Sequence, residues 1–562
     1  MFKRLGCTRI LETFINPKYK YCPLLIPTLK VYMAKGNYKH NKQRKGRYFM
    51  ATCVLFIVVV VVFSVVRTND FLKKYIEHTV NEKVRAHLRT EHHTLAPPTQ
   101  LTRPKPEPKP KPEPAPEPKS KPKPAPETLP ALKPASKPTK AESIALDIRT
   151  GMQRAFQAYM RDAWKADEYM PVQKRGTNTF GGKGLTIIDS LDTLYLMGLQ
   201  DEFNAAQTFV ENDFRFEGHI NVFENNIRVL GGLLSAYVLT DKQVFLTKAK
   251  EVGEVLLRAF PQRIPCGVID TRRPGYCGSQ SWAGGKSINA EIGTLSLEFV
   301  TLSKLTGDAR WSRKIDALHL YWKEHDSNLL QMNIDPRTEQ MSGPATIGGG
   351  IDSTYEYLNK MHIMTGDALA GDLYKTFEKM IVDRMFVKYG DTVFAKAAGS
   401  DDVEHLGCFV GGMLLLGQRE SSKGLGFTET CAKMYTSNPS GIACDKVRIQ
   451  HDGGIHCVND IYLLRPEVVE SIFYAWRFTH DQKWRDYAEK IWKAIAKHCE
   501  VPTGGFTDVR HVTRAVPEKL DKQESWFLAE TMKYLWLVFQ PDEVLPLDQY
   551  VFNTECHPLK IW

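Results

Sequence analysis

Several short motifs that assign an enzyme to a chemical class are missing from this 562-residue chain. It has no Asp-x-Asp, no glycine-rich phosphate loop and no alternation of strand-like with helix-like segments, which argues against a glycosyltransferase. The cysteines of residues 142–562 include no CxxC pair, so a zinc site is not supported. No N-x-Ser/Thr sequon has an allowed middle residue, because Asn438 precedes Pro439, and we expect no N-glycan on this domain.

Acidic residues are nearly absent from the N-terminal tail. Residues 1–47 contain twelve Lys or Arg and one acid, Glu12, and residues 48–66 contain no charge. At about 1.5 Å per residue, residues 48–66 just span a hydrocarbon layer of roughly 27–30 Å, so we predict one transmembrane helix there. A cleaved signal peptide is the alternative, but the apolar run starts far from the N-terminus and lacks a small-residue cleavage site.

The basic tail also predicts the orientation of the chain. Lys and Arg collect on the cytosolic side of a membrane span, so residues 1–47 are expected in the cytosol and everything after residue 66 outside it. This makes the protein a single-pass type II membrane protein. The positive charge is explained by topology and gives no reason to expect binding to nucleic acid.

Apolar residues are scarce in the next segment, residues 67–141. From about residue 95 to residue 139 the chain is mostly Pro, Lys, Glu and Ala. Such a composition cannot bury a core and favours extended polyproline II, so we predict a semi-rigid stem. A proline-rich recognition site is the other interpretation, but its usual cytosolic partner domains are absent outside the cytosol. The stem would hold residues 142–562 away from the membrane.

A carboxylate recurs at the start of six apolar helical runs in residues 142–562. These acids are Asp189 with Asp192, Glu224, Glu291, Asp352, Glu467 and Glu524. Each run closes on a helix-breaking signal that ends in Asp, as in Thr-Gly-Asp308 and Thr-Gly-Asp367. Glycine suits the left-handed position after one helix and Asp suits the N-cap of the next, so each unit is expected to be a helical hairpin.

These hairpins predict an all-α domain that closes on itself. The run 405–417, which begins with His405 in place of an acid, brings the inner helices to seven, and runs such as 244–259 and 483–498 would be outer helices. Hairpins that cannot bury their apolar faces alone must pack on neighbours, and this many could form a ring. The acid-bearing helix starts would then meet at one end of a barrel.

The acids have an ordinary structural explanation, because Asp and Glu favour the first turn of any helix. That preference accounts for one or two of them but not for six beside Arg228 and Arg465. Converging acids, a location outside the cytosol and the aromatic segments 473–476 and 526–527 indicate a carbohydrate-processing enzyme. Cleaving a glycosidic bond needs one protonated carboxylic acid and a second carboxylate. A helical ring without any site is the alternative, and it gives no reason for Thr554 to stand beside Glu555.

Five segments resemble class I α-1,2-mannosidases, which form glycoside hydrolase family 47. They are residues 188–198 (IDSLDTLYLMG), 222–232 (VFENNIRVLGG), 352–358 (DSTYEYL), 464–471 (LRPEVVES) and 550–562 (YVFNTECHPLKIW). Their order along residues 142–562 makes the resemblance specific. It implies an (αα)7 barrel, which agrees with the seven inner helices, and an enzyme that inverts the configuration of the sugar it releases.

The resemblance also implies roles for the acids. Glu224 would be the general acid and Glu467 the general base that acts on water, with Asp352 as the third acid and the alternative base. An inverting enzyme keeps its acid and base roughly 6.5–9.5 Å apart, with a water between them. Arg228 would contact the substrate, although a surface ion pair with Glu224 four residues earlier is the ordinary interpretation.

Family members bind calcium through the side-chain and backbone oxygens of one threonine, which is Thr554 here. Calcium accepts six to eight oxygen ligands in loose geometry, so waters and sugar hydroxyls complete the shell. Further residues implied to bind the substrate or its waters are Glu291, His405, Arg465, Glu470, Trp526, Glu530 and Glu555. Trp526 replaces the usual Phe beneath the sugar ring, and Cys556 replaces an Ala.

Eight of the eleven cysteines fall in residues 142–562, and a lumenal location favours disulfides among them. Cys408 and Cys431 match the pair that the family bridges. We further predict Cys266 with Cys277 and Cys444 with Cys457, because each pair brackets a glycine-containing loop. The residues alone do not determine the pairing of these other cysteines.

The residue two positions before Asp352 separates subclasses of the family. Family members that act in the endoplasmic reticulum have Arg at this position and remove chiefly one mannose, whereas this chain has Gly350. With the type II anchor and stem, this predicts a Golgi enzyme that trims several α-1,2-mannoses from high-mannose N-glycans on glycoproteins. Gly350→Arg is expected to narrow that range if the backbone tolerates a side chain. The alternative is a lectin-like quality-control relative that binds glycans with little hydrolysis.

Overall fold

The protein is described by a computed structural model, which covers residues 138–396 and 400–562. The predicted tail, the predicted transmembrane helix and nearly all of the predicted stem lie outside these residues. Within the part that is described, no helix is long and apolar enough to cross a membrane.

The described domain consists mainly of helical hairpins, each with an inner and an outer helix. The inner helices are α5 (Leu185–Asp189) with α6 (Leu191–Leu196), α9 (Gly231–Thr240), α12 (Ser296–Thr306), α14 (Asp352–Thr365), α16 (Phe409–Gly417), α18 (Glu467–Thr479) and α20 (Met532–Val538). The outer helices are α4 (Lys140–Ala163), α7 (Gln200–Asn212), α10 (Gln243–Leu256), α13 (Ser312–Glu324), α15 (Ala368–Met385), α17 (Ser421–Thr436) and α19 (Gln482–Cys499). The inner helices are more completely buried than the outer ones, as the apolar runs predicted.

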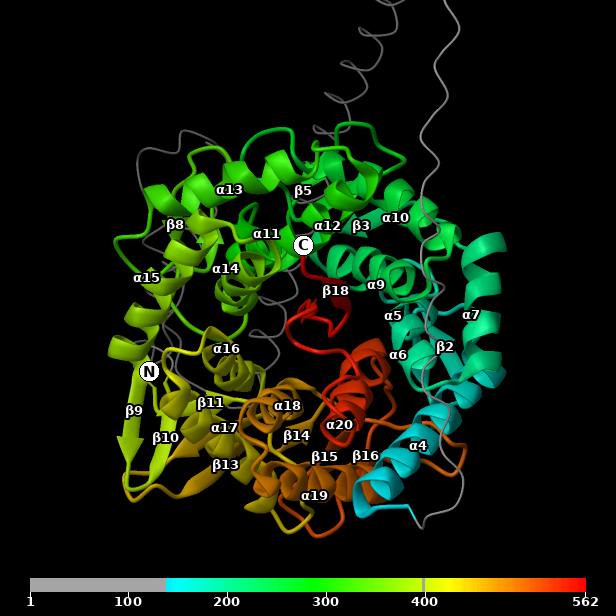
Figure 1. The fold of residues 1–562 in the computed structure, drawn as a ribbon, viewed down its shortest axis with the longest axis vertical. Helices are drawn as coiled ribbons and strands as arrows, with labels where there is room; N and C mark the ends of the chain where they lie inside the picture. Colours follow the sequence, from blue (N-terminus) through cyan, green and yellow to red (C-terminus); the bar gives the residue numbers. More distant parts are fainter. Residues whose placement is uncertain (1–137, 397–399) are drawn as a thin grey trace, which may run out of the picture. The chain divides into compact units, whose positions relative to one another are not determined.

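The inner helices form a closed ring. α6 contacts α9, α9 contacts α12, and contacts continue through α14, α16 and α18 to α20. A π-helical segment that leads into α20, Phe527–Thr531, contacts α5 and α6 and so closes the ring. Figure 1 shows the outer helices around the inner ones, with α4 from the start of the domain beside α20 from its end. The domain is therefore an α-helical barrel.

Local sequence explains where these hairpins turn. Gly366 ends α14 with a φ of 74°, and the side chain of Asp367 accepts hydrogen bonds from the backbone N–H groups of Leu369 (2.8 Å) and Ala370 (3.1 Å). Asp481 caps α19 in the same way through Lys483 N (3.0 Å), while His480 takes the left-handed position that glycine fills elsewhere. The predicted combination of helix stop and N-cap is confirmed at both turns.

Short sheets, which an all-α prediction did not include, connect the helices. The strands are β1 (Glu168–Met170), β2 (Arg175–Thr177), β3 (His219–Asn221), β4 (Val268–Asp270), β5 (Cys277–Gly278), β6 (Ser287–Ile288), β7 (Asn333–Ile334), β8 (Met341–Ser342), β9 (Phe386–Tyr389), β10 (Thr392–Ala395), β11 (Asp402–Glu404), β12 (Lys446–Ile449), β13 (Ile455–Asn459), β14 (Ile461–Tyr462), β15 (Val509–Arg510), β16 (Glu518–Lys519), β17 (Tyr550–Phe552) and β18 (Pro558–Lys560). They pair antiparallel in groups of two or three, as in β3-β4-β5, β6-β7-β8, β11-β12-β13 and β14-β15-β16. Because each has only two to five residues, none produces a clear alternating pattern in the sequence.

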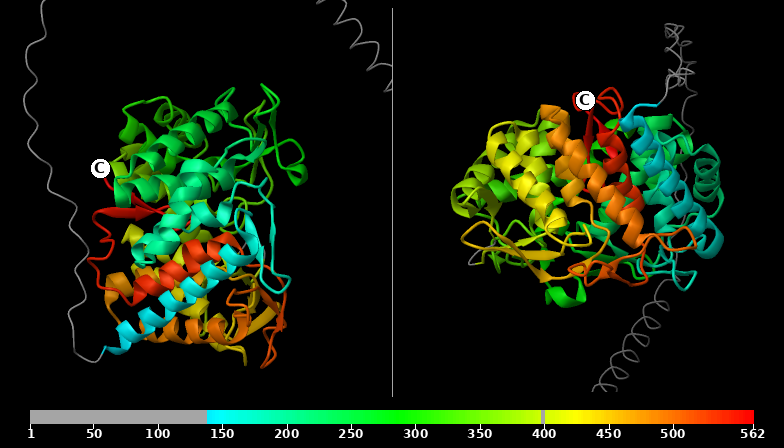
Figure 2. Two further views of the ribbon diagram at one scale, coloured as in Figure 1. Left: turned by 90° about the vertical axis from the view of Figure 1, so that its right-hand side faces the viewer. Right: turned by 90° about the horizontal axis from the view of Figure 1, so that it is seen from below.

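The hairpin of β17 and β18 enters the centre of the barrel. Its turn, residues 553–557, is buried except for a partly exposed Thr554, and it packs against α9, α12 and α14 through the flanking strands. In Figure 1 this hairpin lies inside the ring of helices. Figure 2 shows the C-terminus at one end of the barrel and the sheets of β11 to β16 at the other. The barrel therefore has one end occupied by its own C-terminal segment.

All three predicted disulfides are present. The Cα atoms are 6.0 Å apart in Cys408–Cys431, 5.5 Å in Cys266–Cys277 and 5.9 Å in Cys444–Cys457, within the range of about 4.4–6.8 Å that a disulfide requires. Of the cysteines in the described residues, Cys499 and Cys556 are buried thiols.

Candidate active site

A cavity of about 320 Å³ lies inside the barrel, above the C-terminal hairpin. Eight carboxylates line it but only two guanidinium groups, those of Arg228 and Arg465. The carboxylates belong to Glu224, Glu291, Asp352, Glu356, Glu467, Glu470, Glu530 and Glu555. Assembling this much negative charge is costly unless cations or protons compensate for it, so the cavity has the character of a binding site.

The three predicted catalytic acids come from three separate elements. Asp352 and Glu467 are the first residues of α14 and α18, and Glu224 ends the short helix Val222–Glu224. Three-stranded sheets directly precede two of these positions, since β3 ends at Asn221 and β14 ends at Tyr462. The expected convergence of Glu224, Asp352 and Glu467 on one cavity is therefore found.

Glu224 is held by Arg228 from a π-helical segment, Asn225–Leu230. Arg228 Nε donates to Glu224 Oε2 at 2.8 Å, while Glu224 Oε1 has no hydrogen-bond partner within the described residues. Arg228 is buried and also bonds Glu555 and Ser525 Oγ, the latter at 3.1 Å. The alternative of an ion pair between Arg228 and Glu224 is thus right about the pairing, but the pair lies in the cavity wall and not at the surface.

Asp352 and Glu467 have opposite electrostatic environments. Burial raises the pKa of Asp352 to about 7, despite a hydrogen bond from Ser353 N at 2.9 Å. Burial also acts to raise the pKa of Glu467, but a hydrogen bond from His405 and the charge of Arg465 outweigh it and leave the pKa below its usual range. Of these two acids, Glu467 is therefore the one that its surroundings keep ionised.

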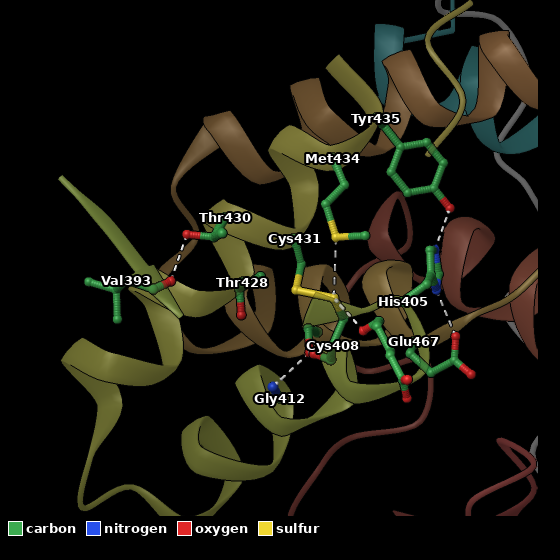
Figure 3. The surroundings of a disulfide bond; sticks show 12 residues. Val393, His405, Cys408, Gly412, Thr428, Thr430, Cys431, Met434, Tyr435 and Glu467 are labelled. Atoms are coloured by element: carbon green, nitrogen blue, oxygen red, sulfur yellow. Dashed lines mark hydrogen bonds and ion pairs between the residues drawn. A yellow bond between two sulfur atoms is a disulfide. The ribbon is translucent and has the colours of Figure 1, made fainter. Parts of the chain in front are cut away.

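His405 does not line the cavity, in contrast to the predicted substrate contact. It is buried behind Glu467, with Nδ1 2.9 Å from Glu467 Oε2 and Nε2 2.9 Å from the Tyr435 hydroxyl (Figure 3). The Cys408–Cys431 disulfide joins the turn that follows His405 to α17, which carries Tyr435. The histidine therefore orients Glu467, and the disulfide ties together the two segments on either side of it.

The remaining predicted acids line the same cavity as Thr554. Burial raises the pKa of Glu470 to about 8, and burial with the charge of Glu224 raises that of Glu291 to about 7. Burial and neighbouring carboxylates also raise the pKa values of Glu530 and Glu555 well above the usual range. These predicted substrate-side acids all line the cavity, and cations or sugar hydroxyls would satisfy their oxygens there.

Thr554 lines the same cavity from the tip of the C-terminal turn. Its backbone N–H donates to the Tyr357 hydroxyl at 3.3 Å, but neither its side-chain hydroxyl nor its carbonyl oxygen has a hydrogen-bond partner among residues 138–396 and 400–562. Both oxygens are thus available to a ligand.

Trp526 lines the cavity as predicted, but the other aromatic segment does not. The Trp526 ring lies 5.2 Å from the Arg228 guanidinium, and its Nε1 donates to Leu463 O at 3.2 Å. Phe473, Tyr474 and Trp476 are buried among the barrel helices instead. Their helix, α18, turns only its N-terminal end toward the cavity, so these aromatic rings serve the core.

Sequence reasoning missed several residues of the cavity wall, among them Glu356 and Trp282. Glu356 stands one helical turn after Asp352, a spacing that could have revealed it, and it pairs with the buried Lys360. Trp282 lies in the loop after the Cys266–Cys277 disulfide and is 66% exposed although it lines the cavity. No repeating pattern marks this loop, so only the fold brings Trp282 to the mouth of the cavity.

Gly350 also lines the cavity, but its backbone conformation disfavours the Gly350→Arg substitution. Its φ is +95°, a region that side chains rarely adopt, and a Cβ atom there would lie 2.7 Å from Met332 Cγ. The condition attached to Gly350→Arg is therefore not met, and that variant would strain the backbone beside Asp352.

The fold and the site together define an α-helical barrel with a carboxylate-lined cavity, and comparison with known proteins assigns this barrel to a family. Residues 151–561 match the model of glycosyl hydrolase family 47. The chain is 38% identical over 450 residues to mannosyl-oligosaccharide 1,2-alpha-mannosidase IB of Mus musculus, and the aligned residues cover 74% of this chain and 69% of that protein. It is 35% identical over 446 residues to mannosyl-oligosaccharide alpha-1,2-mannosidase IA of Drosophila melanogaster, with 74% and 67% covered.

A solved structure agrees with these relatives. An α-1,2-mannosidase from Trichoderma reesei superposes with a TM-score of 0.69 at 26% identity and covers 75% of this chain and 99% of that one. The chain belongs to glycoside hydrolase family 47.

Proposed function

We propose that the protein hydrolyses terminal α-1,2-linked mannose from high-mannose N-glycans with inversion of configuration. The observation that carries the proposal is the convergence of Glu224, Asp352 and Glu467 on one cavity in a family 47 barrel. The relatives named as mannosyl-oligosaccharide 1,2-alpha-mannosidases support the substrate class. The seven inner helices of the ring support an (αα)7 form of the barrel as part of this proposal.

The electrostatic environments favour one division of labour among the acids. Glu467, which His405 and Arg465 keep ionised, takes a proton from the water that attacks the anomeric carbon. Glu224 acts as the proton donor to the departing glycosidic oxygen through Oε1, which has no hydrogen-bond partner within the described residues. Asp352, with a pKa of about 7, is largely protonated at mildly acidic pH and suits the base role less well. The products are free mannose and a glycan with a new hydroxyl.

We include calcium in the proposal, because the free oxygens of Thr554 fit a hard cation. No three His, Cys, Asp or Glu side chains within residues 138–396 and 400–562 are arranged to hold a metal directly, so the ligand set is that threonine with water and sugar oxygens. When bound, the ion supplies coordination to hydroxyls of the terminal mannose. Glu470, Glu530 and Glu555 then accept hydrogen bonds from the surrounding waters or the sugar.

Thr554→Ala is expected to weaken calcium binding by at least about tenfold, which corresponds to about 1.4 kcal/mol. The variant removes the side-chain oxygen but keeps the carbonyl oxygen and the backbone of the turn. Calorimetric titration of the calcium-depleted protein measures the change, and Thr554→Ser, which keeps a hydroxyl, is the matched control. Equal calcium affinities in wild type and Thr554→Ala would contradict the assignment.

Trp282→Ala is expected to raise KM for a nine-mannose glycan by roughly 2- to 12-fold and to leave kcat nearly unchanged. An exposed aromatic face at the cavity mouth suits stacking on a sugar remote from the cleaved bond, and aromatic contacts contribute about 0.5–1.5 kcal/mol. Steady-state kinetics provide the measurement, with Trp282→Phe as the control that keeps a ring. An unchanged KM would remove Trp282 from the substrate site.

The substrate range and location extend the proposal further. Gly350 leaves the wall beside Asp352 without a side chain, which supports removal of several mannoses down to about a five-mannose product. Together with the predicted type II anchor and stem, it supports action in the Golgi membrane with residues 142–562 in the lumen. This conclusion depends on the sequence of residues 1–141, most of which lie outside the described residues.

Incubation of the full-length protein with a nine-mannose N-glycan tests the proposal. Mass spectrometry over time should show loss of several mannoses, and a calcium chelator should stop the reaction. Binding of the glycan without mannose release would favour the lectin-like alternative. Release of a single mannose at high enzyme concentration would contradict the Golgi-type range.

A further inference from the structure

A buried cluster of charged and polar side chains lies beneath the cavity, between the C-terminal turn and the barrel wall. This basal cluster consists of Asp189, Asp192, Arg228, Ser525, Lys533 and His557. All six side chains are at least nine-tenths buried. Only Arg228 among them lines the cavity, so the function proposed above leaves the rest of the cluster unexplained.

His557 stands at the centre of the basal cluster and has an acid on each side of its ring. Its Nδ1 lies 2.8 Å from Asp192 Oδ2, and its Nε2 lies 3.2 Å from Asp189 Oδ1. Ionised carboxylates only accept hydrogen bonds, so both ring nitrogens must donate and the ring is an imidazolium. Burial acts to lower the pKa of His557, but the charge of Asp192 and the two hydrogen bonds outweigh it and raise that pKa.

Asp189 connects His557 to the proposed catalytic acid. Its Oδ2 accepts a hydrogen bond from Ser525 Oγ and lies 3.5 Å from Arg228 Nη1. Arg228 in turn donates to Glu224 and to Glu555. A continuous line of contacts thus runs from the histidine through one aspartate and one arginine to the carboxylate that faces the substrate.

Asp192 connects His557 to the inner helices. Lys533 Nζ of α20 lies 2.9 Å from Asp192 Oδ1 and donates to Cys556 O at 2.7 Å, and Ser235 Oγ of α9 donates to Asp192 Oδ2 at 2.8 Å. His557 is therefore attached to α6, α9 and α20 at once. Because it follows Thr554 by three residues in the same turn, these attachments fix where Thr554 and Glu555 lie.

We propose that His557 is a positioning residue of the reaction, which fixes the turn bearing Thr554 and Glu555 and, through Asp189, the Arg228 guanidinium that orients Glu224. The role rests on the proposed function, but it also requires that replacement of His557 change calcium affinity and kcat. Residues that orient the direct ligands and reacting groups typically change metal affinity or activity by about 10- to 100-fold when they are replaced.

The hairpin has other attachments that should preserve the fold without His557. Asn553 Nδ2 donates to Ile227 O and to Glu298 Oε1, both at 2.8 Å, and β17 pairs with β18 over three residues. His557→Gln keeps a polar side chain but cannot donate to two carboxylates on opposite sides. The turn should therefore stay in the barrel with Glu555 and Arg228 less well placed.

The test compares His557→Gln with His319→Gln in the full-length protein. His319 is also a buried histidine and lies on the outer helix α13, with Nδ1 3.5 Å from Asp367 Oδ2 at the start of α15. Within the described residues, it forms no ion pair or hydrogen bond with a residue of the cavity. Both variants should lower the melting temperature. Only His557→Gln should weaken calcium binding, measured by calorimetry, and lower kcat by about 10- to 100-fold with a smaller change in KM.

Wild-type kcat and calcium affinity in His557→Gln would overturn the proposal, and so would equal losses in His319→Gln. If His557→Gln does not fold, Asp189→Asn replaces it, since this variant keeps the side-chain shape and the His557–Asp192 contact while it weakens the link to Arg228. It should lower kcat, and unchanged kcat would again overturn the role. Wild-type protein that releases no mannose would contradict the proposed function instead, and the calcium titration would still test the positioning role.

Discussion

Glu467→Gln is expected to lower kcat for mannose release by roughly 10²- to 10⁴-fold, the usual contribution of a positioned general base. The amide keeps the shape of the side chain and its place at the start of α18, but it cannot accept a proton from water. The cavity, Thr554 and the aromatic ring of Trp526 remain, so the glycan should still bind. Kinetics with a nine-mannose glycan and direct binding measurements on the same preparation separate the two effects.

Glu429→Gln is the matched control for this loss. Glu429 lies on the outer helix α17 and pairs with Lys433 and Lys483 at the surface, so its replacement should leave kcat unchanged. If Glu467→Gln retains kcat within about threefold of wild type, while Asp352→Asn loses it, the base is Asp352 and the role of His405 as the group that orients the base is wrong.

Glu224→Gln is expected to lower kcat on the natural glycan by roughly 10²- to 10⁴-fold as well, because the departing sugar oxygen then leaves without a proton. The loss should be much smaller with α-mannosyl fluoride, whose fluoride leaves without help from an acid. This dependence on the leaving group distinguishes a proton donor from a residue that only shapes the cavity. Hydrolysis rates for both substrates in wild type and variant provide the measurement.

Asp352→Asn tests whether Asp352 rather than Glu224 is the general acid. If Asp352 rather than Glu224 donated the proton, Asp352→Asn would show the recovery with α-mannosyl fluoride and Glu224→Gln would not. Asp352 has a pKa of about 7 and so holds a proton at mildly acidic pH. It is therefore the rival proton donor that this comparison must test. Equal losses on both substrates for Glu224→Gln would contradict its role as the acid.

Much of the site could be predicted from the sequence because the acids stand at the starts of helices. Apolar runs define the inner helices, the stop and cap residues define their ends, and a closed ring then brings the starts together. Asp352 and Glu467 follow this rule directly. Glu224 follows it with an added detail, since a π-helical segment, which often marks a functional site, begins directly after it. Glu530 lies inside a second π-helical segment, and only the family resemblance pointed to it.

Other features depend on contacts between distant segments, which a sequence pattern does not encode. His405 begins an inner helix like the acids, yet its neighbours Tyr435 and Glu467 enclose it and turn it away from the cavity. The short sheets depend on strands too brief to show alternation, and one of them, with the Cys266–Cys277 disulfide, supports the loop of Trp282. No local motif reveals the positive φ of Gly350 or the nearness of the Met332 side chain to the place a Cβ would take.

The most direct measurement of the central claim is the anomeric configuration of the mannose at the moment of release. An inverting enzyme that acts on an α-linkage with Glu467 activating water must release β-mannose first. Proton NMR of the wild-type reaction, recorded faster than mutarotation, should therefore show the β-anomer before the α-anomer appears. Initial release of α-mannose would require a covalent or otherwise retaining mechanism and would contradict the roles given to Glu224 and Glu467.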